Sequence, residues 1–304
     1  MSNKPKWSAD GFARRVKMSE SDLWLVVEGR NHDRVHYELL LKALPSTQNL
    51  SVAFHLAEEI ELGGVSAGGK PHALALHDHL QKGMKLTTSN SFSSSTIVFM
   101  LDRDRDDFEG KLRKFGHIAY TYGNDVEADI LLHADIWAAF RATYGVDTSI
   151  SQKIESLIDD VPTKLLDIWE SWQVLSLTAL YCGVQGCAPF KSRSLVNPNG
   201  FDAPDEALIN AVVARIQAAV GQDAYTAGRA VAVRHMSVNG VRLLKGDFIA
   251  DYIGYLVKLH LSGETIQMPR ATNIVSTALV ALKYQGPWID NYEDSFSRIL
   301  DHCI

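Results

Sequence analysis

The feature that most constrains this chain is an apolar run that ends in a cluster of acids. An unbroken run of β-branched, aromatic and other apolar residues covers positions 96–101, TIVFML. Such a run predicts a strand buried on both faces, as in parallel sheets that helices cover on both sides. In open α/β sheets, ligands bind just beyond the carboxyl ends of the strands. The acids stand at that end: Asp102, Asp104, Asp106 and Asp107.

The spacing of these acids suggests a metal site. Asp102 and Asp104 are two residues apart, so in a locally extended backbone their side chains point the same way. Two such carboxylates repel each other unless a cation lies between them, and their hard oxygen atoms suit Mg²⁺ or Mn²⁺. The alternative is a solvated polar loop in which Arg103 and Arg105 neutralise the acids.

Composition places the chain among ordinary globular proteins of one large or two smaller domains. It has 304 residues, 46% of them hydrophobic, and a net charge of −6. Three sparse cysteines fit a reducing compartment, and neither a signal peptide nor an apolar run of about 18 residues is present, so we expect a cytoplasmic protein without a membrane segment. Two basic clusters, at positions 4–17 and 111–114, are each typical of a solvated surface.

The first half of the chain alternates strands and helices. We expect strands at 23–27, 50–54, 96–101 and 117–120. Helices are expected at 32–44, with Val35, Leu39, Leu40 and Ala43 on its buried face, at 71–82, and from Asn124 onward. This alternation predicts an α/β domain over residues 22–145, with a parallel four-stranded sheet and helices on both faces.

The remaining segments differ in character. Residues 1–21 are expected to form an arm with fixed structure only near Phe12 to Val16, and 63–69 and 87–95 are expected to be loops. His72, His77 and His79 are expected to be exposed and receive no role. Residues 146–304 predict a mostly helical C-terminal domain, either separate or packed on the sheet.

A second strand end is acidic as well, and together the two ends resemble a known family. Glu28 and Gly29 follow the strand LWLVV, about 75 residues before Asp102-Arg103-Asp104. A glutamate that ends one parallel strand and an Asp-x-Asp that ends another resemble the Toprim fold of type II topoisomerases, primases and OLD-family nucleases. The stretches VVEGRNHDRVHYELLLKAL and YGNDVEADILL are similar to two further segments of OLD-type nucleases, so the resemblance covers about residues 22–135.

The resemblance implies a Toprim domain, a Rossmann-like sheet with flanking helices, and a metal-dependent phosphodiester hydrolase. Asp102 and Asp104 would hold Mg²⁺ or Mn²⁺, and Glu28 would bind a second metal or act as general acid or base. Asp33 lies one residue further from Glu28 than the second acid of related nucleases, and it is left out of the ligand set. The remaining expected site residues are Asp106 and Glu127 as metal ligands, Lys245 as a catalytic residue from the segment LLKGD, and Arg30, Lys111 and Arg113 as phosphate-binding residues.

At the level of biology, the chain resembles the Toprim effector subunit of PARIS-type anti-phage systems. That resemblance implies a toxic nuclease acting on DNA, tRNA or other RNA, partnered by an ABC-type ATPase and able to form a homodimer. Glu127 also has a structural interpretation, because Asn124 and Glu127 have the spacing of a capping box. Two alternatives stay open: a non-catalytic Toprim-like partner of an ATPase, and a metal-dependent phosphatase or nucleotide-sugar enzyme that uses the Asp-x-Asp motif.

Overall fold

The chain folds into two compact units, which we describe separately. The computed structural model describes residues 6–29, 32–90, 94–113, 116–146, 152, 154–184, 197, 200–262 and 272–301. The sheet unit comprises residues 1–103, 112–126 and 283–304. The helical unit comprises residues 104–111 and 127–282.

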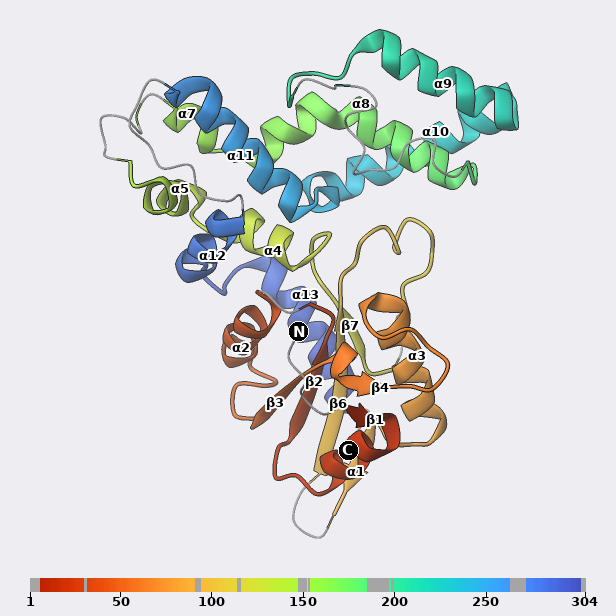
Figure 1. Cartoon of the computed structure of the whole chain (residues 1–304), viewed down its shortest axis with the longest axis vertical. Coiled ribbons are helices and arrows are strands. Elements are labelled where there is room, and N and C mark those ends of the chain that lie inside the picture. The colour runs from red at the N-terminus through yellow and green to blue at the C-terminus, as the bar shows by residue number, and fades with distance from the viewer. Residues whose placement is uncertain are drawn as a thin grey trace. The chain divides into compact units, whose positions relative to one another are not determined.

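The sheet unit contains all the strands that the structure describes (Figure 1). Its strands are β1 (Trp7–Ser8), β2 (Leu23–Val27), β3 (Val52–Leu56), β4 (Ile60–Glu61), β5 (Thr87–Ser89), β6 (Ser94–Leu101) and β7 (Ile118–Tyr120). Its helices are α1 (Ala9–Lys17), α2 (Asp33–Ala43), the 3₁₀ turn η1 (Ala57–Glu59), α3 (Gly69–Lys82) and α13 (Pro287–Asp301).

The main sheet confirms the α/β class predicted from the sequence. β2 lies between β3 and β6, and β6 also pairs with β7; all three pairings are parallel. The short strand β5 pairs antiparallel with the start of β6, which makes the sheet mixed. β1 and β4 form a separate two-stranded parallel sheet. The four predicted strands are thus present, and β5 lies in a segment that was expected to be a loop.

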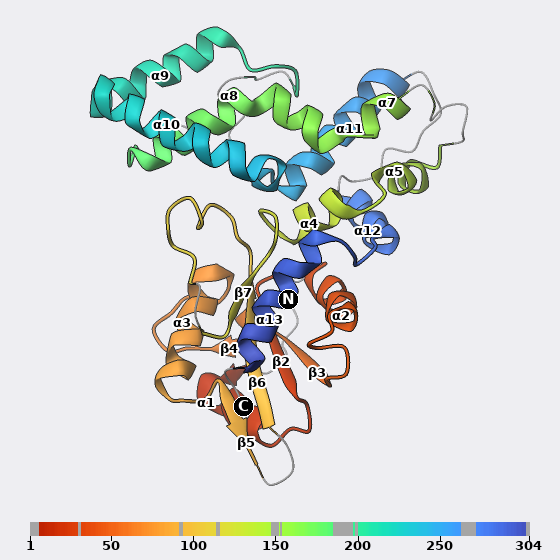
Figure 2. The same ribbon diagram turned by 180° about the vertical axis from the view of Figure 1, so that it is seen from behind.

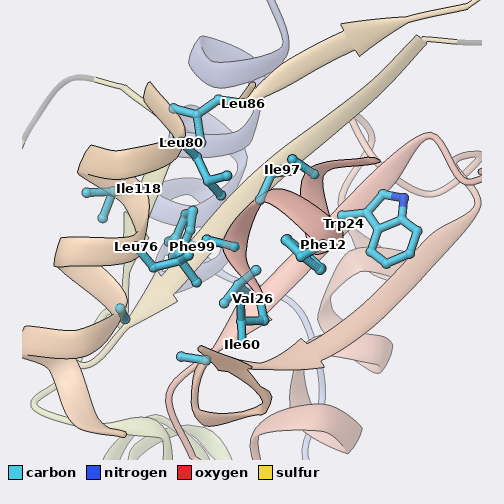
Figure 3. Packing of buried hydrophobic residues seen from close by; sticks show 14 of the residues in the cluster. Phe12, Trp24, Val26, Ile60, Leu76, Leu80, Leu86, Ile97, Phe99 and Ile118 are labelled. Atoms are coloured by element: carbon cyan, nitrogen blue, oxygen red, sulfur yellow. The ribbon is translucent and has the colours of Figure 1, made fainter. Parts of the chain in front are cut away.

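Both faces of the central strands are buried, as their apolar runs predict. Every residue of β2 is buried, and successive side chains of a strand point to opposite faces. Trp24, Val26, Ile97 and Phe99 belong to one hydrophobic cluster, which α1 and α3 complete (Figure 3). The other face is covered by α2 and α13, as the reverse view shows for α13 (Figure 2).

Three expectations for the first half are wrong in detail. The fixed part of the N-terminal segment is longer than expected: it is a helix over Ala9–Lys17, and Phe12 and Val16 lie in the core. On α2 only Leu40 of the four expected core residues is buried, and His36 and Tyr37 are buried in place of the other three. His36 contacts Tyr284 and Trp288 near the C-terminus, a pairing that the local sequence does not reveal. His72 and His77 are also buried rather than exposed.

The helical unit accounts for most of the second half of the chain. Its helices are α4 (Val126–His133), α5 (Ile136–Tyr144), α7 (Glu155–Ile158), α8 (Val161–Tyr181), α9 (Glu206–Val220), α10 (Gln222–Asn239), η3 (Gly240–Leu243), α11 (Gly246–Leu261) and α12 (Thr272–Ala281). α8 and α10 form its main packed pair, with a small hydrophobic cluster between them. None of the helices that the structure describes has the length and apolarity needed to span a bilayer.

The last helix groups with the sheet rather than with the other C-terminal helices. The sequence predicts one helical domain over residues 146–304, whereas residues 283–304 belong to the sheet unit. Glu293 of α13 accepts hydrogen bonds from the backbone N–H and the hydroxyl of Ser46 (3.1 and 3.0 Å). The hydroxyl of Tyr292 accepts a hydrogen bond from the N–H of Tyr122 (3.3 Å). The chain therefore leaves the sheet unit and returns to it.

Candidate active site

Glu28 and Asp102 follow neighbouring strands at the same edge of the sheet. β2 and β6 are parallel, with Val27 opposite Met100. Continuing that register by one residue places Glu28 beside Leu101, directly before Asp102. Both carboxylates are half-buried, and the Oε2 atom of Glu28 is inaccessible to solvent. Neighbouring strands lie about 4.8 Å apart, so the two acids start from adjacent positions at the carboxyl edge.

The backbone on either side of Asp102 is fixed. Leu101 before it is fully buried in β6. After it, the backbone N–H of Arg103 donates to Thr121 Oγ1 and the Nε–H of Arg103 donates to the Thr121 carbonyl, both at 2.9 Å. Thr121 follows β7, so these bonds tie the ends of β6 and β7 together. Asp102 is therefore held between a buried strand residue and an anchored arginine.

Glycine is favoured at position 29 because the Asp33 carboxylate lies close to its Cα atom, and not because the backbone there is left-handed. The backbone N–H of Gly29 donates to Asp33 Oδ2 (2.9 Å), and a Cβ atom at position 29 would lie 2.7 Å from Asp33 Oδ1. Asp33 is buried and is the first residue of α2. The Asp33 carboxylate thus fixes the backbone next to Glu28. This structural role accounts for an acid at position 33 without assigning it as a metal ligand.

The acidic loop after β6 is anchored to the helical unit, of which residues 104–111 form part. The buried guanidinium of Arg105 donates from Nη2 to Ser176 Oγ of α8 (2.9 Å). Burial lowers the pKa of Arg105 to about 10, although the nearby charges of Asp104 and Glu109 oppose that shift. Phe108 packs against the cluster between α8 and α10, with its ring centroid 5.0 Å from that of His235. This loop is therefore not the solvated loop that the sequence left open as an alternative.

Asp104 forms an ion pair with Lys245, the lysine singled out in the sequence. Lys245 Nζ donates to Asp104 Oδ1 at 2.8 Å, and the two side chains are 18% and 38% exposed. Asp104 has a φ of 49°, in the left-handed region, which aspartate tolerates better than most residues. Lys245 stands at the N-cap position of α11. A partly buried ammonium group therefore neutralises the second acid of the Asp-x-Asp motif.

The residue after Lys245 touches the predicted ligand Glu127. A Cβ atom at Gly246 would lie 2.3 Å from the Cβ of Glu127 and 2.4 Å from the backbone nitrogen of Ala128. Glu127 lies in the first turn of α4. The Lys245-Gly246 step thus brings the start of α11 against both Asp104 and the start of α4.

The predicted phosphate-binding residues have partners or lie outside the described residues. Arg113 forms a two-pronged ion pair with Asp78, which raises the pKa of the guanidinium. Lys111 donates to Glu109 (2.6 Å), and this bond raises the pKa of the ammonium group. Both cations are exposed and keep further N–H donors, so their role in phosphate binding stays a prediction. Arg30 lies outside the described residues.

We expect the Asp104–Lys245 pair to contribute measurably to stability. In a double-mutant cycle of Lys245→Met and Asp104→Asn, the coupling free energy should be about 1 kcal/mol, because the pair is partly shielded from water. Asparagine also tolerates the left-handed backbone. The exposed pair Lys42–Glu38 (3.2 Å) is the control and should give less than about 0.5 kcal/mol. Urea denaturation measures both, and equal coupling in the two pairs would contradict this expectation.

The carboxylates at the sheet edge have the oxygen donor chemistry that magnesium ligands have. Within the part of the chain that the structure describes, no three His, Cys, Asp or Glu side chains form a group that could hold a metal by themselves. Mg²⁺, however, is usually bound by one or two carboxylates together with water and substrate phosphate. Glu28 and Asp102 supply two carboxylates in the sheet unit, and the other expected ligands, Asp104, Asp106 and Glu127, belong to the helical unit.

Comparison with known proteins does not assign the chain. No family model matches it, and no curated protein matches it.

Proposed function

We propose that this chain is a divalent-metal-dependent nuclease whose sheet unit is a Toprim-type domain. The observation that carries the proposal is the parallel pairing of β2 with β6, which sets Glu28 and Asp102 on adjacent strand ends. Two carboxylates on rigid neighbouring strands match the donor set that Mg²⁺ takes in phosphate chemistry. The family motifs quoted from the sequence supply the reaction class, phosphodiester cleavage.

In this proposal each residue has a defined task. Bound Mg²⁺ or Mn²⁺ would stabilise the charge that develops on the phosphoryl oxygens and lower the pKa of an attacking water. Asp102 and Glu28 hold the cation, and a Glu28 carboxylate oxygen can also accept a proton as general base. Gly29, Asp33 and Thr121 keep the two acids in place.

Residues of the helical unit keep the roles that the resemblance gives them. Asp104, Asp106 and Glu127 remain predicted ligands, and Lys245 is a predicted catalytic cation that stabilises negative charge on phosphate. By the same resemblance, the chain acts as the toxic effector of an anti-phage system with an ABC-type ATPase partner. A homodimer belongs to the same prediction.

A non-catalytic Toprim-like partner of an ATPase is the second candidate, and the ion pair of Asp104 favours it. From the sequence, repulsion between the two acids of the Asp-x-Asp motif predicts a cation between them. Lys245 neutralises Asp104 without a metal ion. The motif can therefore persist in a fold that has lost catalysis.

Cleavage of nucleic acid by the purified chain tests the proposal. We expect cleavage of plasmid DNA or of total cellular RNA in Mg²⁺ or Mn²⁺ and none in EDTA, and the cleaved polymer identifies the substrate class. If neither polymer is cleaved, expression in cells is the next measurement. A wild-type chain no more toxic than its Glu28→Gln variant would favour the non-catalytic candidate.

A further inference from the structure

An open groove lies on the sheet unit between α1 and the edge strand β3. Its volume is about 710 Å³, and residues of β1, α1, β2 and β3 border it. Among the described strands, β3 pairs only with β2, so it forms one edge of the sheet. The lining combines aromatic rings with arginines: Trp7, Trp24, Phe54, His55, Arg14 and Arg15.

These side chains form a layered arrangement of rings and cations. The guanidinium carbon of Arg15 lies 4.8 Å from the centroid of the Trp7 ring and 5.8 Å from that of Trp24. Trp24 in turn stacks on His55, with centroids 5.1 Å apart and planes 13° from parallel. The adjacent residue of β3, Phe54, points to the opposite face of the sheet, where its ring lies 5.9 Å from the guanidinium carbon of Arg34.

Among the described residues no acid pairs with the two arginines of this groove, whereas His55 Nδ1 lies 3.8 Å from Glu59 Oε2. Arg14 and Arg15 are exposed, and among the described residues no carboxylate lies within 4.0 Å of either guanidinium. Burial lowers the pKa of His55, and the positive charges of Arg15 and Arg34 lower it further, against the opposing effect of Glu59. Arg14 and Arg15 thus give this groove two exposed positive charges in a chain of net charge −6.

One tryptophan of the groove has an indole N–H without a hydrogen bond, and the other has an exposed ring. The indole Nε1–H of Trp24 is buried and finds no acceptor among the described residues, although the side chain is only 3% exposed. Figure 3 places Trp24 at the margin of the hydrophobic cluster rather than at its centre. Trp7 is 37% exposed, which is unusual for a ring that could be buried. The groove therefore offers a ring face and an indole N–H to a ligand.

We propose that this groove binds single-stranded nucleic acid, with an unpaired base stacked against Trp7 and the backbone phosphates on Arg14 and Arg15. Aromatic side chains with a positively charged track are the means by which proteins hold single strands without reading their sequence. A duplex hides the faces of its bases, so the exposed ring selects single strands. The site uses none of the residues assigned to catalysis and goes beyond the proposed function.

The position of the groove relates it to the candidate active site of the same unit. Trp24 and Glu28 lie on β2 and its direct continuation, four residues apart. Extended chain rises about 3.3 Å per residue, which gives about 13 Å along the strand direction. A strand bound in the groove is therefore held near the edge that carries Glu28 and Asp102.

The test measures binding without cleavage. Anisotropy of labelled oligothymidine and oligouridine is followed with the full chain in EDTA at several salt concentrations. For Arg14→Ala/Arg15→Ala we expect weaker binding and a slope of log K against log salt that is shallower by about 1.4, or about 0.7 for each lost phosphate contact. For Trp7→Ala we expect roughly 5- to 100-fold weaker binding, and Trp7→Phe should restore most of it.

The control Arg215→Ala/Arg234→Ala removes the same charge from exposed positions of the helical unit and should bind like the wild type. All substituted side chains are exposed, and thermal denaturation verifies that each variant is folded. Unchanged affinity in Arg14→Ala/Arg15→Ala would overturn the proposal. So would binding of duplex in preference to single strands, or full displacement of the oligonucleotide by polyglutamate. Because EDTA prevents metal-dependent cleavage, these outcomes are independent of whether the chain is a nuclease.

Discussion

Replacing Glu28 by glutamine, or Asp102 by asparagine, should lower the rate of nucleic-acid cleavage by about 10²–10³-fold. Each amide keeps the size of the acid but removes the charge that would hold a divalent cation. A bound metal supplies several kcal/mol of transition-state stabilisation, which corresponds to a loss of this size. The initial cleavage rate of whichever polymer the wild type cuts is the measurement, taken over a range of Mn²⁺ concentrations. A higher Mn²⁺ requirement in the variants would identify the acids as ligands.

Two comparisons separate this loss from a general effect on the fold. Glu61→Gln removes an exposed acid from the same unit and should cleave at the wild-type rate. The double variant Glu28→Gln/Asp102→Asn should be about as slow as the worse single variant, because groups that act as a unit are not additive. Wild-type rates in both single variants, in a chain that does cleave, would remove Glu28 and Asp102 from the mechanism.

The parts of the fold that could be predicted are those that local pattern determines. The apolar runs of β2 and β6 are continuous because both faces of these strands are covered. A continuous apolar run of this kind predicts such a strand from the sequence alone. The end of each run then fixes where Glu28 and Asp102 stand. β5 carries no strand signal in the sequence because its residues, Thr-Thr-Ser, are polar and no apolar run marks them.

The errors arise where distant residues decide what is buried. On α2, hydrophobicity alone favours Val35 and Leu39, yet His36 is buried because Tyr284 and Trp288 pack against it from the far end of the chain. The hydroxyl of Tyr284 donates to the backbone carbonyl of His36 (3.1 Å). No local pattern predicts a contact across 248 residues.

The candidate site shows the same division. The sequence identifies four acids after β6, but not that Arg105 and Phe108 dock that loop onto α8 and α10. The residues of α8 and α10 that Arg105 and Phe108 contact belong to no recognisable sequence motif, so the sequence does not predict this docking. The segment around Lys245, which also has only a weak sequence signal, lies against Asp104 in the structure, and the catalytic role of Lys245 stays a prediction.

Alanine at Gly246 should destabilise the helical unit by at least about 3 kcal/mol, the upper range for overpacking. Its Cβ would lie 2.3 Å from the Cβ of Glu127, 2.4 Å from the backbone carbon of Glu127 and 2.4 Å from the backbone nitrogen of Ala128. Backbone atoms cannot rotate aside as a side chain can, so α4 and α11 would have to separate. Thermal denaturation should show a Tm lowered by about 6–12 °C.

The matched control lies in the same helix. At Gly254 a Cβ would meet only the hydroxyl of Tyr144, at 3.7 Å, which is an ordinary contact. Because glycine disfavours a helix interior, Gly254→Ala should raise stability by up to about 1 kcal/mol. If Gly246→Ala lowers stability while Gly254→Ala raises it, the loss at Gly246 is due to its contact with α4. Separation of α4 and α11 would also displace the neighbouring Lys245, so the coupling between Lys245 and Asp104 should vanish in Gly246→Ala and persist in Gly254→Ala. Equal stability of the two variants would contradict the close contact between α11 and α4.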